Sequence, residues 1–402
     1  MKKQFQFLDK LKDSNLQQIT QLELELKQNY FSTNMLKQLG YEISLCQKIQ
    51  SLVLNIKGEI ICDKSSPQFW NQVYNCSQIQ KINIQLEQSF INLFISTILF
   101  CRNNKIESSG LLFLICDISK CKNLISLTLN LSQNNIQAIG AIELGQELHN
   151  CKKLNFLDLN LSQNNIGCKG IIKILQNITH FKRLENLSLY VDENKIKNVG
   201  AQLIGSEISK CQYLKQITLD IMNNKVNDEG CIQFIQKIAK LTNLQVLRIN
   251  FQKNKFSDQI TSILGQEIVK FINLSQLVLH FGSNELTRES TAQLCQGIQQ
   301  LIFLKDLQIS FYKNWILSHG LKSFVDIVSK MNHLVSLNAN FKNCRIKEQE
   351  LRNVLSEMKN MKKLKILVLN FKENDFTPAV VQKCIQILIK NLIRLLQLKM
   401  DY

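Results

Sequence analysis

The sequence predicts an α/β solenoid in which one strand–turn–helix unit recurs every 30 residues, from residue 91 to residue 390. Two columns define the repeat when consecutive blocks of 30 residues are stacked. The first holds asparagine in all blocks but one, where Cys344 replaces it: Asn104, Asn134, Asn164, Asn194, Asn224, Asn254, Asn284, Asn314 and Asn374. The second column lies two residues later and is apolar in every block. A fixed period of this size indicates a solenoid, because each unit then buries its apolar face only against its neighbours.

The elements of one unit can be read from residues 151–180. Leu157 and Leu159 alternate with polar residues, which is typical of a short strand with one buried face. Ile171 and Ile174 then recur at helical spacing. Because the same connection recurs in each block, neighbouring strands must pair in parallel. Strands stack about 4.8 Å apart and helices about 10 Å. We therefore expect a curved horseshoe with parallel strands on the inner face and helices on the outer face.

The asparagine column has a structural explanation. The turn that follows each strand directs backbone groups inward, where they need partners. An amide both donates and accepts, so stacked asparagines can bond the turn backbone of their own and of neighbouring coils. We interpret eight of these residues as structural: Asn134, Asn164, Asn194, Asn224, Asn254, Asn284, Asn314 and Asn374.

The pattern LxxLxLxLxxNxIxxxGxxxLxxxLxxC resembles the leucine-rich repeat, and the long helical half resembles the ribonuclease-inhibitor-like subfamily. The resemblance covers nearly the whole chain and implies the horseshoe fold. In one respect the chain departs from that subfamily. A further apolar residue precedes the asparagine, at Leu131, Leu161, Val191, Ile221, Phe251, Phe281, Phe311, Phe341 and Phe371. We expect this residue to lengthen the strands slightly and to alter the curvature.

The repeat register divides the chain into four parts. We assign residues 1–15 to an N-terminal cap and residues 16–90 to irregular repeats. Ten 30-residue repeats fill 91–390, and 391–402 form a partial repeat or cap. A half-repeat at 76–90 interrupts the array. It is either a truncated coil or part of a 45-residue coil with extra helix, and it is a candidate partner site.

Cysteines are explained by the same columns. Cys46, Cys76, Cys121, Cys151 and Cys211 share a column with Phe, Leu and Met, which indicates a buried apolar position. We expect Cys121 and Cys151 to lie on adjacent coils and to stay reduced. No Cys/His spacing suggests a zinc site, and no motif suggests a cofactor.

The inner strand face is the first candidate binding surface. Its middle row is polar and nearly neutral, and we take six of its members as candidate partner-binding residues: Asn160, Tyr190, Asp220, Asn250, His280 and Ser310. Such residues adapt readily to a protein partner. The alternative is that a ladder of asparagines merely keeps the strands soluble.

A basic edge is the second candidate surface. The net charge is +17, and many lysines lie where helices end and strands begin, among them Lys152, Lys153, Lys182, Lys210, Lys240, Lys270 and Lys330. Cations there offset helix dipoles, but a positive edge also attracts RNA or an acidic assembly partner such as tubulin. No aromatic residues interleave with it as they do in single-strand binders.

No motif indicates catalysis. The five histidines fall at different repeat positions, and nucleotide-binding, zinc-protease, hydrolase-elbow and kinase signatures are missing. GTPase-activating proteins for Ran resemble this architecture, but the +17 charge argues against that activity. Charges at Asp9, Lys10 and Lys12 argue against a signal peptide, and no apolar run is long enough to span a membrane. We therefore expect a cytoplasmic, non-catalytic scaffold or adaptor that binds another protein, as a monomer or within a larger assembly.

Overall fold

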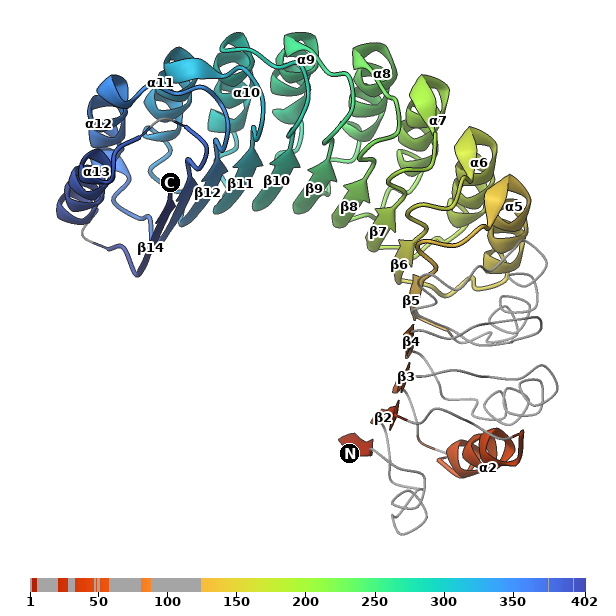
Figure 1. The fold of residues 1–402 in the computed structure, drawn as a ribbon. Helices are drawn as coiled ribbons and strands as arrows, with labels where there is room; N and C mark the ends of the chain where they lie inside the picture. The colour runs from red at the N-terminus through yellow and green to blue at the C-terminus, as the bar shows by residue number, and fades with distance from the viewer. Residues whose placement is uncertain are drawn as a thin grey trace. The chain divides into compact units, whose positions relative to one another are not determined.

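A computed structural model describes residues 2–5, 21–27, 33–46, 48, 51–57, 81–87, 124–374, 376–392 and 394–402. The chain divides into two compact units, Met1–Lys195 and Ile196–Tyr402. Each is an α/β solenoid in which parallel strands line one side and helices the other (Figure 1). The predicted repeat at 91–120, with Asn104 and Cys121, lies outside the described residues, as does Cys76.

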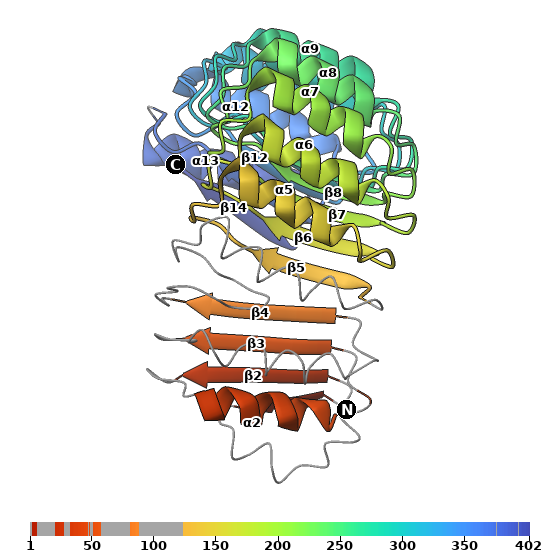
Figure 2. The same cartoon turned by 90° about the vertical axis from the view of Figure 1, so that its right-hand side faces the viewer.

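The first unit contains seven described strands: β1 Lys2–Phe5, β2 Gln21–Lys27, β3 Ser51–Lys57, β4 Lys81–Glu87, β5 Ser126–Asn130, β6 Phe156–Asn160 and β7 Asn186–Tyr190. They pair in chain order and in parallel, as Figure 2 shows for β2 to β4. Its described helices are α2 Thr33–Ser44, α5 Gln137–Leu148 and α6 Gly167–Ile178.

The second unit contains strands β8 Gln216–Asp220, β9 Val246–Asn250, β10 Gln276–His280, β11 Asp306–Ser310, β12 Ser336–Asn340, β13 Ile366–Asn370 and β14 Gln397–Asp401. The intervening helices are α7 Lys197–Ile208, α8 Asp228–Ile238, α9 Asp258–Ile268, α10 Glu289–Gln299, α11 Leu317–Val328, α12 Glu348–Ser356 and α13 Pro378–Asn391, with a short 3₁₀ turn at Glu357–Asn360. Within this unit the strands lie on the concave side and the helices on the convex side (Figure 1).

Strand register follows the sequence period. Gln276 pairs with Asp306 and Asp306 with Ser336, so each residue faces its equivalent 30 positions later. The offset differs at β4, where Ile82 pairs with Leu127, 45 positions later. It also differs at the end of the chain, where Ile366 pairs with Gln397, 31 positions later. These two changes mark where the spacing of the coils departs from the regular repeat.

The core lies between the strands and the helices. In β6, Leu157 and Leu159 are fully buried, while the residues between them reach the other face. The additional apolar residue after each strand extends the core, and it also extends the ladder, because Phe251 N donates to His280 O at 2.7 Å. In the second unit this column becomes a row of stacked rings, Phe251, Phe281, Phe311, Phe341 and Phe371, with centroids 5.2 to 6.1 Å apart.

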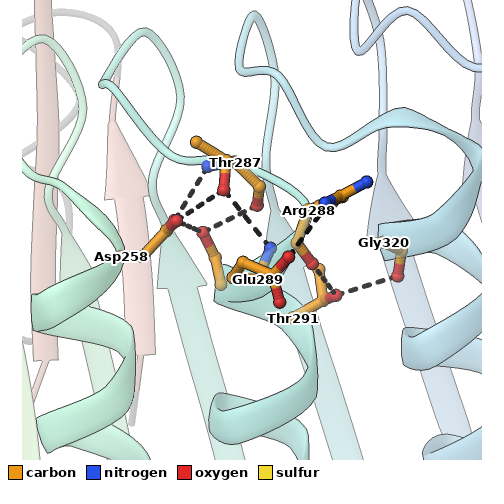
Figure 3. A network of polar contacts seen from close by, with 7 residues as sticks. Asp258, Thr287, Arg288, Glu289, Thr291 and Gly320 are labelled. Atoms are coloured by element: carbon orange, nitrogen blue, oxygen red, sulfur yellow. Dashed lines mark hydrogen bonds and ion pairs between the residues drawn. The ribbon is translucent and has the colours of Figure 1, made fainter.

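A second set of contacts links successive coils where their helices begin (Figure 3). The Asp258 carboxylate, at the start of α9, accepts from the Thr287 backbone N–H at 2.8 Å, and from the Thr287 and Ser290 hydroxyls. Asp228 accepts from Ser257 in the same way, one coil earlier. A carboxylate at a helix N-terminus thus satisfies unpaired donors and favours the dipole. These contacts hold neighbouring coils in register.

Helix packing in the second unit is very close at one point. The backbone of Gly297 in α10 lies against Gly265 in α9, and a Cβ added at Gly297 would stand 1.9 Å from Gly265 O. Only glycine allows this approach. Among the described residues, no helix is long and apolar enough to cross a membrane.

Candidate protein-binding surface

The face of the sheet that the helices leave uncovered is the candidate site. In β5 to β13 the first, third and fifth residues of each strand point to this side, which we call the inner face. The second and fourth residues are buried against the helices. Three rows of partly exposed side chains therefore run across the parallel strands.

The fifth residue of most strands has a structural function. Asn160 Oδ1 accepts from the Ser162 backbone N–H at 3.0 Å, and Asn250 Oδ1 from the Gln252 N–H at 3.1 Å. Asp220 Oδ1 accepts from Met222 N–H at 2.9 Å. Each side chain closes an Asx turn over the backbone two residues ahead. These three predicted partner-binding residues lie on the inner face, but they also stabilise the strand end.

Three predicted residues depart from this arrangement. Tyr190 and His280 are half-buried on the inner face, and they belong to different units. Ser310 is only 5% exposed, and its hydroxyl has no hydrogen-bond partner among the described residues. Our expectation that Ser310 would present its hydroxyl to a partner needs correction. The short side chain lies between the larger His280 and Asn340, its paired residues on β10 and β12.

A hydrogen-bonded network crosses three strands of the second unit. The Arg248 guanidinium on β9 donates to Gln276 Oε1 on β10, and Gln276 Nε2 donates to Asp306 on β11. Alongside, Gln308 Nε2 lies 3.2 Å from His280 Nε2. We call these five residues the inner-face network. Burial lowers the pKa of His280, so the imidazole is neutral near pH 7.

Sequence reasoning found only part of this network. It placed His280 in the middle row and Arg248 and Gln308 in the row beside it, but it did not consider Gln276 and Asp306. Their positions as first strand residues would have placed them on the same face. What the sequence did not reveal is that the long side chains of Arg248 and Gln276 reach diagonally across to the next strand.

The inner face of the first unit is acidic at two positions. Burial raises the pKa of Asp158 on β6. Burial also raises the pKa of Asp192, while a hydrogen bond from Ser162 opposes that shift. Partly buried carboxylates without a cationic partner cost free energy when they ionise. They indicate a surface whose charge is not optimised for folding alone.

The predicted structural asparagines lie under the strand ends, as their column required. Asn254 Nδ2 donates to Ile221 O at 3.0 Å, Phe251 O at 3.2 Å and Gln252 O at 3.2 Å. Its Oδ1 accepts from two buried backbone N–H groups of the preceding coil, those of Asn224 and Val226. Equivalent contacts to neighbouring coils are made by other members of the column: Asn164, Asn194, Asn224, Asn284, Asn314 and Asn374. Asn134 bonds its own turn at Leu131 O and Ser132 O.

Cys344 replaces one asparagine and reproduces half of its function. Its thiol lies 3.1 Å from Phe311 O, the carbonyl that an asparagine amide would reach. No side-chain oxygen is present at this position to accept from the preceding coil. Burial raises the pKa of Cys344 to about 12, and backbone N–H groups of Asn314 and Lys313 oppose the shift.

The basic edge is also present in the structure. Lys152, Lys153, Lys182 and Arg183 are exposed in the first unit. Some cations of the second unit are paired, Lys210 with Glu207 at 2.7 Å and Lys270 with Glu267 at 2.5 Å. At the opposite edge, after the strands, the Arg345 guanidinium lies 4.3 Å from the Trp315 ring centre, and Lys342 Nζ 5.4 Å from that of Tyr312. Sequence reasoning missed these aromatic–basic pairs.

Comparison with known proteins adds little. No protein-family model matches the sequence, and no curated protein matches it. A structure of internalin C2 from Listeria monocytogenes is similar over 68% of this chain and 80% of that chain, with 21% identity and a TM-score of 0.30. The fold is defined by its own geometry: parallel strands, one helix per coil and an asparagine at each turn. The chain is a leucine-rich-repeat protein.

Proposed function

We propose that this protein is a non-catalytic scaffold or adaptor that binds another protein on its inner face. The inner-face network carries the proposal. It lies on the side of the sheet that helices leave uncovered, and none of its five side chains caps a turn or fills the core. Hydrogen-bonding groups already held in place offer a partner polar contacts at low entropic cost.

The proposal extends to the subfamily and the compartment. Helices of 9 to 14 residues in each coil of the second unit support a place in the ribonuclease-inhibitor-like subfamily. Buried thiols at Cys211, Cys231 and Cys295 support a reducing compartment such as the cytoplasm. Histidines scattered over different repeat positions support the absence of catalysis.

A basic-surface binder of RNA, or of an acidic partner such as tubulin, is the second candidate. The pairs Trp315–Arg345 and Tyr312–Lys342 favour it, because they place aromatic rings among cations at one edge of the second unit. Stacked rings and guanidinium groups are common contacts of single-stranded nucleic acid.

The test compares one identified partner across matched variants. Chemical crosslinking in native lysate identifies the partner, and affinity is then measured with purified proteins. Arg248→Ala with Gln308→Ala should weaken binding at least tenfold, with mild salt dependence, whereas Lys152→Glu with Lys182→Glu should leave it unchanged. Tyr190→Ala tests the first unit separately. If the network variant binds normally and affinity falls about a thousandfold between roughly 50 and 200 mM salt, the basic surface is the binding site.

A further inference from the structure

The turns that lead from each helix into the next strand form one edge of the second unit. Their two tip residues are the second and third of every repeat, and hydrogen bonds such as Leu274 N to Phe271 O, at 3.0 Å, close the turn. Most tips are polar, as exposed turns require. The tips are Gln212 and Tyr213, Thr242 and Asn243, Ile272 and Asn273, Ile302 and Phe303, Asn332 and His333, and Lys362 and Lys363.

Asparagine at the third position has a structural use. Asn243 Nδ2 donates to Gln212 O at 3.3 Å, and Asn273 Nδ2 donates to Thr242 O at 3.0 Å, so each amide joins its turn to the preceding one. Tyr213 and Phe303 occupy the same position with aromatic rings. The fold therefore does not require an aromatic residue here.

Four tips are apolar and strongly exposed. Tyr213, Ile272, Ile302 and Phe303 expose 57 to 68% of their surface. Ile272 and Ile302 lie on neighbouring coils, because the strands that follow them pair Gln276 with Asp306. Phe303 is next to Ile302 in the chain, so these three form one apolar cluster. A cluster of this kind, rimmed by polar residues, marks an interaction site.

Lysines surround the apolar tips. Lys240, Lys305 and Lys330 are exposed and lie within the same turns or directly before them. Lys270 is there too, bound to Glu267. The only carboxylates that pair with lysines at this edge, among the described residues, come from the helix ends at Glu207 and Glu267. The rim of the cluster is therefore positively charged.

We propose that this edge of the second unit binds the surface of an anionic lipid bilayer, inserting Tyr213, Ile272, Ile302 and Phe303 among the headgroups. The apolar side chains stand on the tips of successive turns, an arrangement that fits a flat surface. The lysine rim is complementary to anionic headgroups. Buried apolar area and attraction of cations to acidic lipid act together in such interfacial binding.

Vesicle co-sedimentation tests the proposal with the full chain. The probes are vesicles of phosphatidylcholine alone and of phosphatidylcholine with about a third phosphatidylserine, since binding requires anionic lipid. We expect binding to the second composition only. Ile302→Ser with Phe303→Ser should lower it at least tenfold, and Lys305→Glu should lower it by about fivefold or more. Trp315→Ser is the matched control at the opposite edge and should bind as the unaltered protein does.

Insertion has its own readout. Phe303→Trp should give fluorescence that brominated lipid quenches, beyond any quenching seen with the two native tryptophans. Three outcomes would overturn the proposal: no binding to anionic vesicles, equal loss with Trp315→Ser, or binding that high salt abolishes while Ile302→Ser with Phe303→Ser has no effect. An edge that captures only an acidic peptide with apolar anchors also overturns it. Circular dichroism of each variant verifies that these exposed substitutions leave the fold intact.

Discussion

Replacement of Asn254 by alanine tests most directly what holds the coils together. The asparagine lies under the end of β9 and bonds the turn backbone of two coils. Asn254→Ala removes the only side-chain oxygen that the structure places on the N–H groups of Asn224 and Val226, both in fully buried residues. The substitution is small and apolar, so it adds no steric conflict.

The expected cost comes mainly from the two N–H groups. A buried donor left unpaired costs about 1–3 kcal/mol, so two of them set a range of about 2–6 kcal/mol before the turn relaxes. The carbonyls lose less, because Phe251 O keeps the amide of Asn284 and Gln252 O keeps the N–H of Asn223. We expect a loss of about 2–4 kcal/mol in the free energy of unfolding.

Hydrogen exchange measures this loss where it occurs. A repeat array does not always unfold as one cooperative unit, so the protection of amides 221–227 is more informative than a single melting curve. Urea unfolding followed by circular dichroism supplies the global value. Asn332→Ala, at an exposed turn tip, is the control and should change stability by less than about 0.5 kcal/mol. Unchanged protection at amides 221–227 would refute the assigned function of the column.

Cys344 provides the reciprocal experiment. Asn254→Cys keeps a donor near Ile221 O but loses the acceptor, so it should cost nearly as much as Asn254→Ala. Cys344→Asn restores the acceptor for the turn of Asn314 and should stabilise by up to about 1 kcal/mol. A destabilised Cys344→Asn would mean that its neighbours have adapted to the smaller thiol.

Three further results are expected. Gly297→Ala should destabilise by at least about 3 kcal/mol, because its Cβ would meet Gly265 O at 1.9 Å; Gly282→Ala, which meets only side-chain atoms at 3.1 Å and beyond, should be nearly neutral in the same urea titration. Cys46 and Cys211, whose pKa values burial raises to about 11 and about 12, should resist iodoacetamide until the protein unfolds, whereas the partly exposed Cys168 should react first by mass spectrometry. Asp158→Asn should raise stability at pH 7: burial raises the folded pKa of Asp158 above its unfolded value, so ionisation opposes folding above that pKa and the penalty disappears as the pH falls. The difference in urea midpoint between the Asp158→Asn variant and the unaltered protein should therefore shrink from pH 7 to pH 4, and a constant difference would contradict the assignment.

The sequence predicted the fold because every constraint in a solenoid repeats. A single strand signal such as Leu157 and Leu159 is weak alone, but its recurrence at 30 residues also sets the parallel register that pairs Phe156 with Asn186. In the irregular part, Leu22 and Leu52 were placed in one column, and they are paired residues of β2 and β3. The period alone thus carries the information on tertiary contacts.

The binding surface was harder to predict, since one residue type serves two purposes. Asparagine at the strand end fits both a docking surface and an Asx turn, and only the distance from Asn250 Oδ1 to Gln252 N separates the two. The network from Arg248 to Asp306 depends on side-chain reach between strands, which a column cannot show. Ser310 was misjudged because its burial depends on the size of its neighbours.

Departures from a column locate function better than the column itself. The most frequent residue at a repeated position reports what the fold needs there, so an exception that costs stability has another reason to exist. At the strand ends the exceptions are Tyr190, His280 and Ser310, and at the turn tips they are Tyr213, Ile272, Ile302 and Phe303. Most of them lie between residues 272 and 310, on the two coils around β10 and β11, where the inner-face network is also found. If the inner face and the tip edge served no ligand, the most frequent residue could be restored at these positions without loss of function. His280→Asn with Ser310→Asn should then raise stability by closing two more Asx turns while abolishing partner binding, and retention of full affinity would refute the link between exception and function.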